Sequence, residues 1–160
     1  MNIRALLFGP YYRRRQNRKI ADNIRTYGWH CLHVFPVRDD QDKFSYSIGF
    51  AESFGAPEVL IFGRERESAH ALLNECANLL KDGHIIRPDV EYADVLSGDY
   101  KVIFRSVRPE CFGEYLGTAL RYYRPKEFGA VVMFIPDREH RFPWQAGYDY
   151  IPANDSLAIV

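Results

Sequence analysis

The chain has 160 residues, of which 47% are hydrophobic and 15% are aromatic, and its formal net charge is zero. This composition excludes an intrinsically disordered chain, and the length favours one folded domain over two. We expect a cytoplasmic protein without a membrane partner, because no apolar run could cross a bilayer, the N-terminus lacks a secretory pattern and the 3 cysteines are odd in number.

The neutral total conceals an uneven distribution of charge. Residues 1–30 carry a net charge of +6 and the remaining residues carry −6. We therefore separate a basic N-terminal extension, residues 1–19, from a single domain, residues 20–160. The extension could bind nucleic acid or an anionic membrane. It could equally dock on the acidic surface of its own domain or of a neighbour, or exchange between the subunits of a homodimer. The side chains for a nucleic-acid contact are Arg13, Arg14, Arg15, Arg18 and Lys19.

The first half of the chain predicts a helix followed by three strands. The helix covers residues 11–27, with an apolar stripe that consists of Ile20, Ile24 and Tyr27. Residues 29–35 form the first strand. Residues 44–50, FSYSIGF, alternate apolar and small residues, which predicts a strand with one buried face. Residues 59–62, VLIF, predict a strand buried on both faces.

A long amphipathic helix follows the third strand and ends at Gly83. Its apolar stripe consists of Ala69, Leu72, Leu73, Cys76, Leu79 and Leu80. His70 lies at the edge of this stripe, and we expect it to make a buried hydrogen bond to the sheet or to the Tyr46 region. The alternative for His70 is an acid-base or ligand-binding role.

The second half of the chain adds two strands and another helix. Residues 100–107 and 130–135 predict strands, and residues 109–123 predict the helix between them. Three successive strands followed by alternating helices and strands indicate an α+β fold. We expect a single mixed or mostly antiparallel sheet of about five strands with helices packed on it.

The strongest candidate for a functional site is the C-terminal loop, residues 136–149, PDREHRFPWQAGYD, which leaves the end of a buried strand. Trp, Tyr and Arg are the residue types that dominate binding hot spots. The candidate partner-binding residues are Arg138, His140, Arg141, Trp144 and Tyr148. In the structural alternative, residues 142–144 cap the sheet and Arg141 pairs with Asp137 or Asp149.

The sequence contains acid-base groups, but no motif completes a catalytic site. His70, Asp137 and Asp149 are possible acid-base groups, with His140 beside the carboxylates of the C-terminal loop. No nucleophile motif and no nucleotide-binding fingerprint accompanies them. We therefore expect no catalytic residue and no cofactor.

A metal site is also disfavoured. His30, Cys31 and His33 crowd one predicted strand. Alternate side chains of a strand point to opposite faces, so only Cys31 and His33 converge. A structural zinc site needs four ligands, and we therefore expect none here.

Several separated motifs together resemble a known family. They are SYSIGF from Ser45, FGAPEVLIFG from Phe54, AHALLN from Ala69 and PDREHRFPWQAGYD from Pro136. In this order they are similar to the bacterial family catalogued as domain of unknown function 4262, over about residues 20–149. The resemblance implies a compact single bacterial domain and transfers no activity and no catalytic residue. The chain departs from the family pattern at residues 1–19 and 84–96.

Without a catalytic set, the sequence favours a function in binding. We expect a non-catalytic protein-binding module, and within that class an immunity or accessory protein that occludes a toxin or an enzyme. One alternative is a small hydrolase-type enzyme that uses a His/Asp site on the C-terminal loop. The other is a nucleic-acid-binding protein that uses the basic extension.

Overall fold

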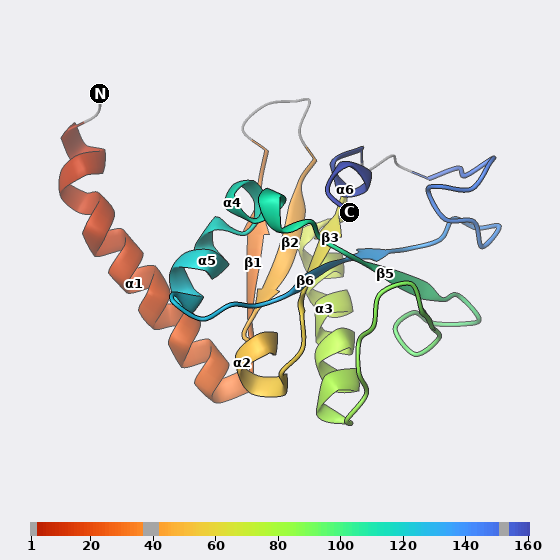
Figure 1. Ribbon diagram of the computed structural model, residues 1–160, viewed down its shortest axis with the longest axis horizontal. Coiled ribbons are helices and arrows are strands. Elements are labelled where there is room, and N and C mark those ends of the chain that lie inside the picture. Colours follow the sequence, from red (N-terminus) through yellow and green to blue (C-terminus); the bar gives the residue numbers. More distant parts are fainter. Residues whose placement is uncertain (1–2, 37–41, 151–153) are drawn as a thin grey trace.

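A single six-stranded sheet organises the fold (Figure 1). The computed structural model describes residues 3–36, 42–150 and 154–160. The strands are β1 (His30–Val34), β2 (Phe44–Ile48), β3 (Glu58–Phe62), β4 (Glu91–Tyr92), β5 (Val102–Ser106) and β6 (Ala130–Phe134). Their spatial order is β1-β2-β3-β6-β5-β4. β3 and β6 are parallel and the other neighbours are antiparallel, so the predicted α+β fold with one mixed sheet is confirmed.

Helices cover both faces of the sheet. They are α1 (Ile3–Tyr27), α2 (Phe50–Phe54), α3 (Arg66–Lys81), α4 (Phe112–Tyr115), α5 (Gly117–Tyr123) and α6 (Asn154–Ala158), with a 3-10 turn at Pro109–Cys111. Figure 1 shows α3 behind the sheet, and α1, α4 and α5 on the side nearer the viewer. No helix in the described ranges is both long enough and apolar enough to cross a membrane.

Two hydrophobic cores follow from this layering. The first lies between the sheet and α1, α4 and α5, and includes Ile20, Ile24 and Leu116. The second lies between the sheet and α3, and includes Leu73 and Cys76. β3 and β6 are buried along their whole length because both faces are covered. The continuously apolar strands of the sequence are therefore the centre of the sheet.

The prediction for β2 is wrong in one respect. We expected one buried face, but all five residues of this strand are buried. The two small polar residues are satisfied inside the protein: Ser45 Oγ lies 2.7 Å from His33 Nδ1, and Ser47 Oγ donates to the Glu58 carboxylate. The apolar and the small polar side chains of this strand therefore point to opposite faces of the sheet, and both faces are buried.

Several element boundaries also differ from the prediction. Phe50 does not end a strand; it begins α2 and is fully buried. The predicted helix over 109–123 breaks at Leu116, where two nearby glycines of low helix propensity, Gly113 and Gly117, flank a residue with φ −117° and ψ 25°. α1 begins well before residue 11, and Tyr27 at its end is 63% exposed. β4 was missed because two residues carry no periodicity.

Candidate functional site

The C-terminal loop leaves β6 and is organised around one buried carboxylate. Asp137 is 2% exposed. Its two oxygens accept hydrogen bonds of 2.9 Å from the backbone N–H groups of Glu139, Arg141 and Asp149. Arg141 Nε donates a further bond of 2.9 Å to the same carboxylate. Both ends of the loop are thus tied to a single side chain.

The hydrogen bonds to Asp137 also determine its charge. Burial alone would raise the pKa of Asp137, but the N–H groups of Asp149 and Arg141, the Arg141 side chain and the N–H of Glu139 together lower it to about 2. The carboxylate is therefore ionised at neutral pH. A group in this state cannot donate a proton as a general acid. The structure gives Asp137 the bracing contact with Arg141 that we predicted as the structural alternative.

The centre of the C-terminal loop packs against the sheet. Phe142 is buried in the first core. Trp144 is 37% exposed and stacks on Phe142 with a ring separation of 5.1 Å. Arg105 belongs to β5, the strand that pairs with β6. Its guanidinium lies 3.5 Å from the centroid of the Trp144 ring. Trp144 is therefore held in a fixed orientation with part of its ring open to solvent.

The tip of the C-terminal loop presents its polar side chains outward. Arg138 and His140 are exposed. The His140 ring stacks on Tyr100 with a centroid separation of 4.5 Å, and its Nε2 lies 3.9 Å from the carboxylate of Asp99. His140 has φ +60°, a backbone conformation that non-glycine residues adopt only in special turns. The sequence did not indicate this contact between His140 and Asp99.

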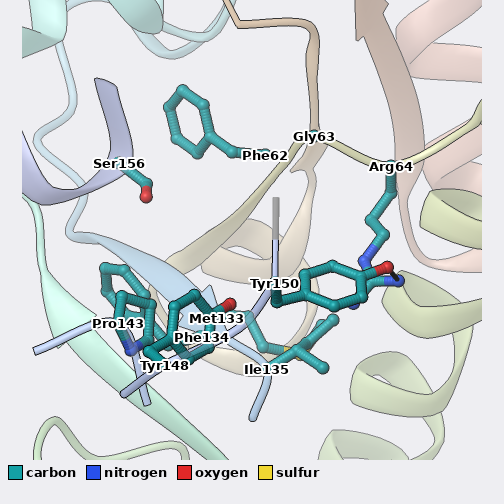
Figure 2. A pocket seen from close by; sticks show the side chains of 10 residues that line it. All are labelled: Phe62, Gly63, Arg64, Met133, Phe134, Ile135, Pro143, Tyr148, Tyr150 and Ser156. Atoms are coloured by element: carbon teal, nitrogen blue, oxygen red, sulfur yellow. Dashed lines mark hydrogen bonds between the residues drawn. The ribbon is translucent and has the colours of Figure 1, made fainter. Parts of the chain in front are cut away.

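Tyr148 lies in a small hollow at the end of the loop. Figure 2 shows it beside Pro143 and Phe134, with Arg64 reaching from the other side toward Tyr150. The Arg64 guanidinium lies 4.5 Å from the centroid of the Tyr150 ring. The hollow has a volume of about 40 Å³, which is room for a few water molecules at most. It is too small for a substrate, and Tyr148 is half-buried in its wall.

The possible acid-base groups do not assemble. Asp149 is exposed and meets Asp137 through its backbone N–H. No hydrogen bond or ion pair among the described residues joins His140 or His70 to either carboxylate. His70 lies on α3, and its ring packs on Trp29 at 5.4 Å.

The prediction that His70 is buried is wrong. It is exposed, and Tyr46 belongs to the core on the opposite face of the sheet. The buried stripe of α3 runs through Ala69 and Leu73, which leaves His70 beside the outer edge of β1.

A second surface, which we call the β1 groove, follows that outer edge. It comprises two adjoining openings of about 410 Å³ and about 470 Å³ that share five residues. Its walls come from α1, β1 and α3. The lining residues are Tyr12, Arg15, Gln16, Lys19, Asn23, His30, Cys31, Leu32, His33, Phe35, Arg66, Glu67 and His70.

The surroundings of His30 and His33 in the β1 groove disfavour their charged forms. Asn23 Nδ2 lies 2.8 Å from His30 Nδ1, and an amide nitrogen only donates, so Nδ1 must be the acceptor. Burial, Lys19 and His33 lower the pKa of His30 to about 4. Burial, Arg66 and His70 lower the pKa of His33, against an opposing effect of Glu67.

Cys31 and His33 are the side chains in the β1 groove that most resemble a catalytic nucleophile with its base. Cys31 Sγ lies 3.4 Å from His33 Nε2, and the other ring nitrogen lies 2.7 Å from Ser45 Oγ. Burial raises the pKa of the Cys31 thiol to about 12, with Arg66 opposing, so the thiolate is disfavoured at neutral pH. The His30 side chain lies on the other face of β1 from Cys31 and His33, as predicted, and it contacts Asn23 there. No group of three or more metal-ligating side chains occurs among the described residues.

The cationic residues of the basic extension lie around α1. Arg13, Arg14, Arg15, Arg18 and Lys19 are all exposed. Three successive residues of a helix point about 100° apart, so these side chains do not form one face. Arg15 and Lys19 are four residues apart, and they alone among the five line the β1 groove.

Residues 23–149 match the family model described as domain of unknown function (DUF4262). The chain belongs to the DUF4262 family. No curated protein and no solved structure matches it. The motifs that carried the resemblance are therefore structural and sequence features of a DUF4262 domain, and they bring no recorded activity with them.

Two of these DUF4262 motifs meet at a buried carboxylate that the sequence analysis missed. Glu58 is 0% exposed. It accepts hydrogen bonds from the backbone N–H groups of Gly49, Phe50 and Ala51, at 3.0, 3.3 and 3.1 Å, where α2 begins. The hydroxyls of Ser47 and Tyr123 donate to it as well. These contacts join β2, α2, β3 and α5.

Burial raises the pKa of Glu58, and the bonds from Ser47, Tyr123 and the backbone oppose that shift. Every one of its oxygens has donors, so this carboxylate has the satisfied environment of a structural group. The available signal in the sequence was a glutamate adjoining a continuously apolar strand, because a charged residue in that position must find partners inside the protein.

Proposed function

We propose that this domain is a non-catalytic protein-binding module whose partner-binding surface is the C-terminal loop and the adjoining Tyr150. Within that class we propose an immunity or accessory role, in which the loop occludes a toxin or an enzyme in the bacterial cytoplasm. One observation supports this most strongly. The loop is pinned internally by Asp137, yet it turns Arg138 and Trp144 toward solvent, beside the exposed Tyr150.

Internal pinning reduces the cost of binding. Ordering a mobile loop costs conformational entropy at the moment of association, and a loop that is already ordered avoids that cost. The backbone bonds from Asp137 N to Arg141 O, at 2.8 Å, and from Gln145 N to Phe142 O, at 2.9 Å, add to the contacts of the carboxylate. The surface is therefore suited to rigid recognition.

The exposed groups have the chemistry of a binding hot spot. Trp144 and Tyr150 are each 37% exposed, and each ring has an arginine packed on it, Arg105 and Arg64 respectively. Aromatic and arginine side chains contribute large contact areas with few rotatable bonds. A shallow hollow of about 230 Å³ between Tyr100 and Tyr150 could receive one side chain of a partner.

The cytoplasmic part of the proposal agrees with the state of the cysteines. All three, Cys31, Cys76 and Cys111, are free thiols, as is usual in a reducing compartment.

The proposal is tested by capture of the partner from a lysate of the source organism. The bait proteins are the wild type, Trp144→Ala and the matched control Tyr27→Ala, which removes an equally aromatic and more exposed side chain from the end of α1. We expect one stoichiometric protein that binds the wild type and Tyr27→Ala and is lost with Trp144→Ala. A partner that is retained by well-folded Trp144→Ala would refute the assignment of the surface. The absence of any specific partner would refute the function.

A further inference from the structure

The outer edge of β1 is an unpaired strand edge. β1 is the first strand in the spatial order and pairs with β2 only. Among the described residues, no other strand lies on its outer side. In an antiparallel edge strand, alternate residues direct their N–H and C=O groups away from the sheet. β1 therefore offers backbone donors and acceptors to another chain.

Three protections of a strand edge are missing from β1 itself. Edges are commonly blocked by lysine, by proline or by an irregular bulge within the strand, or are covered by a helix or loop. The sequence of β1, HCLHV, contains neither lysine nor proline, and its five residues pair with β2 in continuous register. The β1 groove runs beside this edge from His30 to Phe35, between α1 and α3. An extended segment of about five residues, spanning roughly 17 Å, matches that length.

The walls of the β1 groove are positively charged. Arg15 and Lys19 line it from α1, and Arg66 lines it from α3. None of these three makes an ion pair with another described residue. Glu67 is the one acidic side chain in the described lining. Within the part of the chain that the structure describes, the groove thus combines an open strand edge with cationic groups on both sides that make no ion pair.

We propose that the β1 groove binds an extended acidic peptide segment of a partner protein, which adds a strand to the sheet beside β1. Backbone hydrogen bonds to β1 would supply the pairing, as in other cases of strand addition. Carboxylates of the peptide would meet Lys19 and Arg15 on one side and Arg66 on the other. This site is separate from the surface of the C-terminal loop and does not depend on it.

The titratable groups of the groove should make the affinity for an acidic peptide depend on pH. The facing groups are Arg15 and Lys19 from α1, His30, Cys31 and His33 from β1, and Arg66, Glu67 and His70 from α3. Positive neighbours and burial hold the pKa of His30 and of His33 below the ordinary value of 6.5. An acidic peptide would raise both pKa values, so binding takes up protons, and for His30 it does so as pH falls toward 4.

The test uses fluorescence anisotropy with the full chain and three labelled ten-residue peptides. The first alternates glutamate and valine. The second alternates glutamate and proline, which keeps the charge but removes every second N–H donor and disfavours a strand. The third alternates lysine and valine. We expect saturable binding of the first peptide alone.

Two variants locate the binding. The double variant Lys19→Glu, Arg66→Glu should bind the glutamate-valine peptide at least tenfold more weakly than the wild type. Arg25→Glu is the matched control, because Arg25 is an exposed arginine of α1 outside the groove, and it should bind like the wild type. Circular dichroism establishes that each variant is folded. Amide exchange of the alternate residues of β1 whose N–H groups point away from β2 should slow when the peptide is bound.

Four results would overturn the proposal. Equal binding of the glutamate-proline peptide would make the groove a simple anion site. Tighter binding of a single-stranded oligonucleotide, with the same loss in the double variant, would make it a nucleic-acid site. Self-association that the double variant abolishes would make the occupant a second copy of this chain. If the folded wild type bound none of the probes, the β1 groove would not be a binding site for an acidic peptide.

Discussion

The carboxylate of Asp137 lies 2.9 Å from Nε of Arg141, and the same carboxylate accepts the backbone N–H groups at both ends of the C-terminal loop. The pKa of Asp137 is about 2 in the folded protein, below the ordinary value of 3.8. A lowered pKa stabilises the fold above pH 3.8, and this contribution is lost as pH falls from 3.8 toward 2.

We therefore predict that acid loosens the loop in that window. The amide signals of Glu139, Arg141 and Asp149 should titrate together in NMR spectra, with a midpoint near pH 2. Asp137→Asn should show the loosened loop already at neutral pH, as faster trypsin cleavage after Arg138 and Arg141. A common midpoint near 3.8 would contradict the role of these hydrogen bonds.

The Glu58 network predicts an order of stability among variants. Glu58→Ala should lower the free energy of unfolding by about 3 kcal/mol or more, because it leaves buried hydroxyl and N–H groups without an acceptor and opens a cavity. Tyr123→Phe should cost about 1–3 kcal/mol, since it removes a donor to Glu58 and an acceptor for the N–H of Gly49.

The neighbouring tyrosine provides a matched control for this series. Tyr122 donates to the exposed carboxylate of Glu52 at 3.0 Å, so Tyr122→Phe should change the free energy of unfolding by less than about 0.5 kcal/mol. Urea denaturation measures all three variants. Equal effects of Tyr122→Phe and Tyr123→Phe would show that the buried network does not stabilise the fold.

A second stability prediction concerns the SYSIGF motif. Gly49 has φ +121°, and a Cβ there would lie 2.8 Å from Ile24 Cγ1 and 2.9 Å from Trp29 Cα. Gly49→Ala should therefore cost about 3 kcal/mol or more, from backbone strain and steric overlap together. Gly55 has φ +63° and open space around the same position, so Gly55→Ala should cost only about 1 kcal/mol. Thermal unfolding with similar losses for the two variants would contradict this reasoning.

The β1 groove predicts the titration of His30. Its pKa should be about 4 by NMR, because burial and the charge of Lys19 both disfavour the imidazolium. Lys19→Ala should raise this pKa, and Arg25→Ala, which is outside the groove, should leave it unchanged. Since the folded pKa is the lower one, the contribution of neutral His30 to stability is lost as pH falls from 6.5 toward 4. A midpoint near 6.5 would show that His30 is solvated.

The elements that the sequence predicted well are those with strong periodicity. The apolar stripe of α3 appears at three- and four-residue spacing, and β3 and β6 appear as uninterrupted apolar runs between turn signals. The pairing of Arg141 with Asp137 could also be foreseen, because both residues lie within one loop. Local patterns determine these features.

The features that were missed depend on contacts between distant residues. α2 forms where the Glu58 carboxylate receives three N–H groups, and no pattern within residues 50–54 indicates that contact. His70 is exposed because α1 and α3 leave the edge of β1 open between them, a consequence of how separate elements pack. The β1 groove could not be predicted for the same reason.

The most direct test of the proposed function is the affinity of the captured partner for purified variants by calorimetry. If Trp144 is the hot spot of the interface, Trp144→Ala should lose about 2 kcal/mol of binding free energy, or about 30-fold in Kd. Tyr27→Ala should bind like the wild type. Trp144→Ala should melt lower than the wild type, because it removes the contacts with Phe142 and Arg105, but both variants must be folded at the temperature of the measurement. An unchanged Kd for folded Trp144→Ala would show that the C-terminal loop is a structural cap of the sheet and that the partner binds elsewhere.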